Sequence, residues 1–166
     1  VISRDGNNWF HVFTIDKGKK DGIQVDMNVI AGNGLVGIVS EVGESYAKVR
    51  AIIDDKSNVS AMFQDTGETC IVKGNMESIY KGYIDIEMIS NTAKIKDGDE
   101  VVTSHVSDKF LRGLSVGYVK DIVSDPSSQT KTAHLIPSVN FDQLENVLVI
   151  TQLKDNSEIK DIKNYD

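Results

Sequence analysis

Apolar and polar residues alternate in short runs along most of this chain. A period of two is typical of β-strands with one buried face, because successive side chains point to opposite sides of a strand. Gly, Asn and Asp separate the runs, and these residues favour tight turns. The pattern predicts strands at residues 1–4, 10–15, 27–31, 35–42, 46–53, 58–63, 69–74, 79–87, 100–104, 115–123, 131–138 and 146–152.

The composition also favours an all-β protein. The chain has 19 Val and 18 Ile, against 7 Leu and 6 Ala. β-Branched side chains lose freedom in a helix and pack well on a pleated sheet, so this ratio indicates strands. The dipeptides Asp21-Gly22, Asn33-Gly34 and Asp97-Gly98 place a residue that tolerates positive φ beside glycine, as tight hairpins require. We therefore expect a sandwich or barrel architecture.

Charge and cysteine content exclude several classes of protein. The chain has 18 Lys and Arg against 25 Asp and Glu, a net charge of −7, and it lacks the basic clusters that neutralise nucleic-acid phosphates. We expect no nucleic-acid partner. Cys70 is the single cysteine, so no internal disulfide can form, and no Cys and His group has zinc-ligand spacing. The sequence predicts neither a structural metal nor a cofactor.

Part of the chain repeats. The first copy contains Asp21-Gly22 and residues 27–39, and the second contains Asp97-Gly98 and residues 100–119 with a longer loop at 105–112. Chance similarity among hairpins rich in Gly and Val is the alternative explanation. Two β units fit the length, and barrel closure would remove their exposed edges. The sequence thus predicts two six-stranded barrels, leaving open whether they exchange strands, and a charged, disordered tail: residues 1–66, 67–153 and 154–166 respectively.

One segment matches a catalytic pattern. Residues 113–117 read Gly-Leu-Ser-Val-Gly, the G-x-S-x-G pattern of serine hydrolases, but there the serine stands on a turn into a helix, whereas the alternation here continues as a strand. The three histidines, His11, His105 and His134, are not accompanied by the Gly-Asp-Ser-Gly sequence of chymotrypsin-like proteases. We expect no catalytic residue. A serine hydrolase or peptidase that uses Ser115 with one of these histidines is the alternative.

Two acidic groups have ordinary structural explanations. Asp54-Asp55 follows a predicted strand, and Asp97-Gly98 is a hairpin dipeptide. Neither group has the glycine and glutamate positions of an EF-hand loop. We therefore assign both groups to turns rather than to a cation site.

Several aromatic and apolar residues are candidates for a contact surface. Phe13 and Phe63 alternate within strands, as core residues do, whereas the tyrosines near residue 80 are less regular. The pair Phe110-Leu111 stands in a polar loop, and an exposed apolar pair there indicates a partner surface. The sequence predicts these residues at a partner interface: Trp9, Phe10, Tyr80, Tyr83, Phe110 and Leu111.

Motifs spread over residues 1 to about 150 resemble, in their order, the extracytoplasmic region of the MreC family of bacterial rod-shape-determining proteins. Those in the first half are Val1-Ile2, Arg4-Asp5, Asn8-Trp9-Phe10, Ile15-Asp16-Lys17-Gly18, Asp21-Gly22, Gly34-Leu35-Val36-Gly37, Val39 and Val42. Those in the second half are Gly98-Asp99, Val101-Val102-Thr103-Ser104, Phe110, Gly113, Val116-Gly117, Pro137, Phe141, Leu144-Glu145 and Val147. Together they are far more specific than any one motif.

The resemblance implies a fold, a location and a role. It implies two barrels similar to those of chymotrypsin-like proteases without the catalytic residues. It implies a single-pass membrane protein whose transmembrane helix and coiled coil precede this region, which lies outside the cytoplasm; because the chain begins with Val1 rather than Met, we expect a fragment of a longer protein. It also implies a non-enzymatic scaffold of the cell-wall elongation machinery that self-associates, binds MreD and a class B penicillin-binding transpeptidase, and acts indirectly with MreB.

Overall fold

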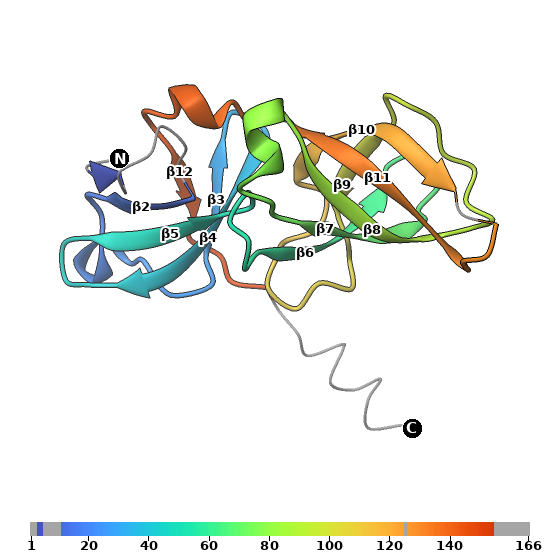
Figure 1. The fold of residues 1–166 in the computed structure, drawn as a ribbon. Helices are drawn as coiled ribbons and strands as arrows, with labels where there is room; N and C mark the ends of the chain where they lie inside the picture. Colours follow the sequence, from blue (N-terminus) through green and yellow to red (C-terminus); the bar gives the residue numbers. More distant parts are fainter. Residues whose placement is uncertain (1–2, 5–10, 125, 155–166) are drawn as a thin grey trace, which may run out of the picture.

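A computed structural model describes residues 3–4, 11–124 and 126–154, and its regular structure is almost entirely β-strand (Figure 1). Each strand overlaps one that the alternation predicts, so the all-β prediction is confirmed. The strands are β1 (Ser3–Arg4), β2 (Val12–Ile15), β3 (Asn28–Ala31), β4 (Gly34–Val42), β5 (Ala47–Ala51), β6 (Asn58–Phe63), β7 (Thr69–Lys73), β8 (Ile84–Ser90), β9 (Glu100–Thr103), β10 (Ser115–Ser124), β11 (Thr130–Pro137) and β12 (Leu148–Ile150). Three short 3₁₀ helices join them: η1 (Lys19–Asp21), η2 (Ser78–Lys81) and η3 (Phe141–Gln143).

One strand begins later than the sequence predicts. The strand expected at 79–87 starts at Ile84, because η2 comes first. The side-chain oxygen of Asn75 accepts hydrogen bonds from the backbone N–H groups of Glu77 and Ser78, at 3.1 and 3.0 Å, and Gly82 ends the turn with φ 93°. Local bonds of this kind compete with sheet pairing and override the alternation.

Six strands form a closed barrel. β10 pairs with β11, followed in order by β8, β7, β6 and β9, and β9 pairs back with β10, every pair being antiparallel. Closure leaves this part of the molecule without an exposed strand edge. Inward-facing side chains such as Ile86, Val119 and Leu135 are almost fully buried.

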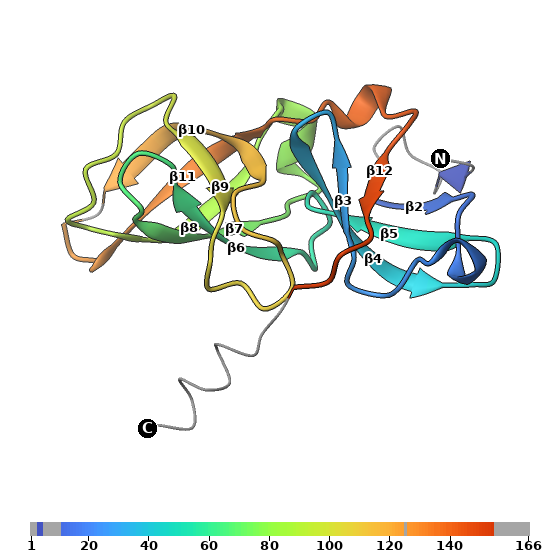
Figure 2. The ribbon, with the colours of Figure 1, turned by 180° about the vertical axis from the view of Figure 1, so that it is seen from behind.

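The other six strands form a sheet beside the barrel. Its order is β1, β2, β5, β4, β3 and β12, and within the described residues β12 pairs only with β3. A short parallel pairing between Gly34 of β4 and Ser115 of β10 joins this sheet to the barrel. Figures 1 and 2 show the result as two lobes side by side, which we call the sheet lobe and the barrel lobe.

The strand pairing does not follow the division predicted between residues 66 and 67. Strand β6, expected in the first unit, pairs with β7 and β9 in the barrel lobe. Strand β12, expected in the second unit, pairs with β3 in the sheet lobe. The two lobes therefore exchange one strand each, through crossover segments at 52–57 and 138–147. Alternation locates strands but carries no information about which distant strand is the partner.

The repeat found in the sequence occupies corresponding positions in the two lobes. Val39 and Val119 each donate a backbone hydrogen bond to the segment that leads into the preceding strand, at 2.9 and 3.0 Å. Gly37 and Gly117 each face a neighbouring strand so closely that a Cβ would lie 2.0 and 2.2 Å from a carbonyl oxygen. This agreement in geometry favours a structural repeat over chance similarity of hairpins.

One hydrophobic core extends through both lobes. The cluster contains Phe13 of the sheet lobe, Phe63 of the barrel lobe and Phe141 of the crossover segment 138–147. All three rings are at most 2% exposed. Burial of a large apolar side chain contributes about 1.5–3 kcal/mol, so the shared core joins the lobes more strongly than the single short pairing between β4 and β10.

Candidate functional site

Tyr80 and Tyr83, predicted at an interface, lie where η2 leads into β8. Tyr80 is 59% exposed. Tyr83 is half-buried because its ring stacks on His134 of β11, with the ring centroids 3.8 Å apart and the planes inclined by 15°. His134 Nδ1 lies 3.1 Å from Asp121 Oδ2 of β10. Side chains from two adjacent strands, β11 and β10, therefore fix the position of Tyr83.

Two further residues extend this surface. Tyr118 of β10 and Ile136 of β11 are cross-strand partners, and they are 44% and 43% exposed. Ile136 and His134 are two residues apart and so project from the same side of β11. We call this group the tyrosine face: Tyr80, Tyr83, Tyr118, His134 and Ile136. Exposed aromatic and apolar side chains grouped on a rigid barrel are typical of contact surfaces.

The sequence analysis did not select Tyr118 or Ile136. Both lie in strands rich in core residues, and a strand assignment alone does not separate its two faces. The signal was present in the alternation, because each stands next to a buried residue, Val119 and Leu135 respectively. An outward position in a strand is normally polar, and an aromatic or branched apolar residue there is the informative exception.

A cavity of about 270 Å³ adjoins the tyrosine face. It lies between η2 and the crossover segment 138–147, and its lining includes Ile79, Gly82, Ile136 and Phe141. Apolar recesses beside exposed aromatic residues suit the anchor side chains of a partner protein. The cavity and the tyrosine face share Ile136 and are continuous.

The structure separates the other predicted interface residues. Phe110 is 5% exposed and belongs to the core, so the prediction that it forms an exposed apolar pair is wrong; Leu111 is half-buried. The loop turns Phe110 inward because Ser107 Oγ accepts the Phe110 N–H, at 3.0 Å. Trp9 and Phe10 lie outside the described residues, and their interface role stays a prediction.

Ser115 is not arranged as a nucleophile. It lies in β10, is 7% exposed, and its hydroxyl is 2.8 Å from the hydroxyl of Ser138. A hydrolytic serine needs a base within hydrogen-bond reach. His11 and His134 are each paired with an aspartate instead, and within the described part of the chain no hydrogen bond joins Ser115 to a histidine.

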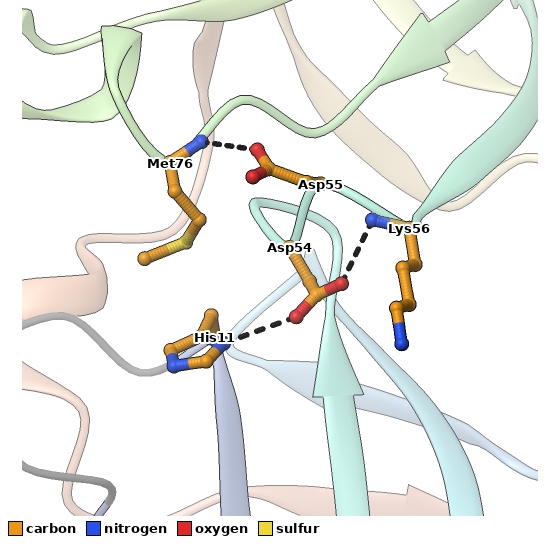
Figure 3. Close-up of polar contacts among 5 residues, drawn as sticks. All are labelled: His11, Asp54, Asp55, Lys56 and Met76. Atoms are coloured by element: carbon orange, nitrogen blue, oxygen red, sulfur yellow. Dashed lines mark hydrogen bonds and ion pairs between the residues drawn. The ribbon is translucent and has the colours of Figure 1, made fainter.

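Asp54 and Asp55 stabilise the crossover segment between β5 and β6 (Figure 3). Asp54 Oδ2 lies 3.0 Å from His11 Nδ1, and Asp54 Oδ1 accepts the Lys56 N–H at 2.8 Å. Asp55 Oδ1 accepts the Met76 N–H, also at 2.8 Å. The first aspartate thus supports a turn, as predicted, while the second connects this segment to the loop before η2.

Residues 11–124 and 126–154 contain no site that is arranged to bind a metal ion or to activate a thiol. This part of the chain contains no group of three His, Cys, Asp or Glu side chains placed to hold a metal ion. Burial raises the pKa of the Cys70 thiol to about 12, so the thiol is protonated at neutral pH and is a poor nucleophile. No helix among the described residues is long and apolar enough to cross a membrane.

The fold and this surface define a class: an all-β chain with a closed barrel beside a second sheet, in which the tyrosine face carries exposed aromatic and apolar side chains. The family model for the barrel core of the rod shape-determining protein MreC matches residues 1–151, and the chain belongs to this family.

Relatives agree in sequence and in fold. The cell shape-determining protein MreC of Listeria monocytogenes is 32% identical over 158 residues, which are 90% of this chain and 51% of that protein. The chain thus spans about half the length of the curated relatives that it matches. The crystal structure of MreC from Pseudomonas aeruginosa has a TM-score of 0.81 at 27% identity and covers 90% of this chain and 94% of that one. A structure described as a complex between Penicillin-Binding Protein (PBP2) and MreC from Helicobacter pylori has the same fold, with a TM-score of 0.66 at 17% identity over 89% of this chain and 91% of that one.

Proposed function

We propose that this chain is a non-enzymatic scaffold of the cell-wall elongation machinery, which acts by binding other proteins and copies of itself. Its principal partner is a class B penicillin-binding transpeptidase. MreD is a further partner, and MreB is connected indirectly. The chain works outside the cytoplasm, in the periplasm or the cell-wall space, held at the cell membrane by a single transmembrane helix that belongs to the longer protein.

The tyrosine face is the observation that carries this proposal. It places exposed apolar side chains on a closed, rigid barrel, and Tyr83 is fixed by stacking on His134 rather than free to rotate. Preorganised aromatic residues lose little conformational entropy on binding and are common hot spots of protein interfaces. The complex of PBP2 with an MreC of the same fold supports a transpeptidase as the partner class.

A scaffold of this kind would act on the transpeptidase by population shift. A binding protein that prefers one conformation of its partner moves the partner toward that conformation, by no more than the difference between the two affinities. Equal affinity for the open and closed forms of the transpeptidase would limit the chain to positioning its partner.

Light scattering coupled to size-exclusion chromatography tests the binding proposal. The chain is measured over a wide concentration range, alone and with the extracytoplasmic domain of the class B transpeptidase from the same organism. We expect a mass that grows with concentration and a mixed complex. A monomer at every concentration that leaves the transpeptidase unbound would contradict both parts of the proposal.

Substitutions then locate the surface. Tyr118→Ala and Ile136→Ala should each weaken binding of the transpeptidase by about ten-fold or more without lowering the melting temperature. Tyr46→Ala is the matched control, because Tyr46 is 39% exposed but lies on the sheet lobe. Equal losses for all three variants would show that the tyrosine face is not the binding surface.

The absence of enzymatic activity has its own test. A fluorophosphonate probe labels serines that an adjacent base activates. We expect no labelling of the native protein above that of Ser115→Ala. Labelling that the Ser115→Ala variant loses would support the serine hydrolase alternative.

A further inference from the structure

Strand β12 is an apolar strand that the fold leaves uncovered. Leu148, Val149 and Ile150 are all apolar, yet Leu148 is 65% exposed and the other two are only half-buried. In the barrel lobe β6 holds the corresponding position beside β9, and four of its six residues are buried. The difference arises because β6 pairs along both edges, with β7 and β9, whereas among the described strands β12 pairs only with β3.

A cavity lies beside the unpaired edge of β12. Its volume is about 420 Å³, and residues 146–149 line one side, while Ile15, Lys17 and Ile23 are among the residues that line the other. Figure 2 shows β12, drawn in red, next to β3 in the sheet lobe. The outer edge of β12 therefore borders open space rather than a neighbouring strand.

The unpaired edge is suited to bind another strand. It presents backbone N–H and C=O groups, and natural proteins usually protect such edges with charged side chains or proline. Residues 146–153 contain neither. The chain as a whole has a net charge of −7, which keeps copies apart, so an uncharged edge is a place where two copies can approach each other.

The sequence around β12 is complementary to itself in the antiparallel direction. Residues 146–152 read Asn-Val-Leu-Val-Ile-Thr-Gln. With Val149 as the centre, residues of similar shape or chemistry lie opposite each other: Leu148 and Ile150, Val147 and Thr151, Asn146 and Gln152. Two copies related by a two-fold axis at Val149 would thus pair aliphatic with aliphatic and amide with amide side chains.

The flanking charges and the two faces of the strand agree with this arrangement. Glu145 and Lys154 have opposite signs, and antiparallel pairing brings the Glu145 end of each copy to the Lys154 end of the other. Val149 packs against the core, so Leu148 and Ile150 project from the opposite face. In the pair, Leu148 of each copy would lie beside Ile150 of the other, and these exposed side chains would cover one another.

We propose that β12 joins two copies of this chain by antiparallel pairing about Val149, so that one sheet continues from one sheet lobe into the next. This inference rests on the self-association in the proposed function and assigns it to a definite strand edge. A contact of one strand from each copy is small, so the dimer should be weak and its population should rise with concentration. The tyrosine face, on the barrel lobe, stays available to the transpeptidase.

Sedimentation equilibrium, which measures the dissociation constant of the dimer, is the first test. Leu148→Lys should raise this constant by about ten-fold or more, because it places a charge opposite Ile150 of the second copy. Val123→Lys is the matched control: Val123 is 59% exposed, close to the value for Leu148, but it lies on the barrel lobe. Both variants should keep the native melting temperature, and Leu148→Lys should still bind the transpeptidase.

Two double variants at exposed positions test the register. Asn146 and Gln152 are both exposed, so these variants decide the question even if Leu148→Lys impairs folding. Asn146→Lys with Gln152→Glu places opposite charges across the pair and should dimerise at least as tightly as the unchanged protein. Asn146→Lys with Gln152→Lys places like charges there and should weaken the dimer by about ten-fold. General repulsion between negative chains predicts the reverse order, because the second variant is the less negative.

Four results would overturn the proposal. A dimer that Leu148→Lys leaves unchanged would place self-association elsewhere, with the proposed function intact. Equal dissociation constants for the two double variants would exclude pairing about Val149. Loss of transpeptidase binding in Leu148→Lys, with the dimer kept, would assign this edge to the transpeptidase. A monomeric unchanged protein at every concentration would contradict the self-association in the proposed function as well.

Discussion

The two lobes share one repeated pattern of strands, but the strands are joined differently in each lobe. In the barrel lobe, β6 and β7 form a hairpin with five residue pairs that closes the ring. In the sheet lobe the corresponding strands are β12 and β1, which come from opposite ends of the sequence, and β1 is described over Ser3–Arg4. A hairpin brings its own strands together locally, whereas chain ends must be brought together by the rest of the fold. The same strand pattern can therefore give a closed barrel or a sheet, depending on where the chain is connected.

The exchange of β6 and β12 also couples the two lobes. Each lobe contains a strand supplied by the other half of the sequence, and one hydrophobic cluster runs through both. Neither half of the sequence contains all the strands of one lobe. The lobes should therefore unfold together, even though their shapes suggest two independent domains.

Removal of a core ring from each lobe should have the largest effect. Phe110→Ala in the barrel lobe and Phe13→Ala in the sheet lobe should each lower the free energy of unfolding by about 3–5 kcal/mol, because both rings are at least 95% buried. Urea denaturation followed by fluorescence and by circular dichroism should give one shared transition for each variant. Two separated transitions, with one lobe unaffected, would show that the strand exchange does not couple the lobes.

The equivalent glycines should respond alike. Gly37→Ala and Gly117→Ala each place a Cβ within about 2 Å of a backbone carbonyl oxygen, and backbone cannot move aside as a flexible side chain can. We expect each substitution to cost about 2–3 kcal/mol of stability. Thermal unfolding measures the two losses, with Ser40→Ala in β4 as the control.

Unequal losses of stability in Gly37→Ala and Gly117→Ala would show how the two lobes differ. If Gly117→Ala is damaging and Gly37→Ala is tolerated, the sheet lobe can adjust the spacing of β4 and β5, because no pairing among the described residues closes its sheet. If both are tolerated, the close approach of the strands is not a requirement of the repeat.

The strands followed from the sequence because their signal is local. Alternation with a period of two located β3, β4 and β10 within two residues, and Tyr80 was selected because it departs from that alternation. Strand partners and the burial of Phe110 depend on contacts between residues far apart in the chain, which no periodicity records. The hydrogen bonds of Asn28 with Lys109 and Leu111 belong to the same category, since they join residues more than 80 positions apart.

The two pairs of histidine and aspartate, His11–Asp54 and His134–Asp121, should differ by a smaller amount in their contribution to stability. Asp54 of the crossover segment 52–57 is 12% exposed where it contacts His11, whereas Asp121 is 49% exposed beside His134 on the barrel. Asp54→Asn should cost about 1.5 kcal/mol, since a partly buried charged acceptor of two hydrogen bonds is replaced. Asp121→Asn should cost less than about 0.5 kcal/mol, because exposed ion pairs contribute little and Asn tolerates the positive φ of this position. Chemical denaturation at low salt measures both; a larger loss at Asp121 would show that the tyrosine face depends on this pair for its stability.

The buried Cys70 thiol should lower the stability of the protein at alkaline pH and have no such effect at neutral pH. The pKa of Cys70 rises from 9.0 to about 12 on burial, so above pH 9 the unfolded chain releases a proton that the folded chain retains. Stability from this group is therefore complete below about pH 9 and is lost as the pH rises toward 12. Between about pH 8 and 10 the unchanged protein should lose about 1 kcal/mol more than Cys70→Ala, whatever packing loss that variant shows at neutral pH. Urea denaturation at both pH values measures the two slopes. Parallel slopes would mean that the folded barrel admits enough water to ionise the thiol, which would contradict the burial of Cys70.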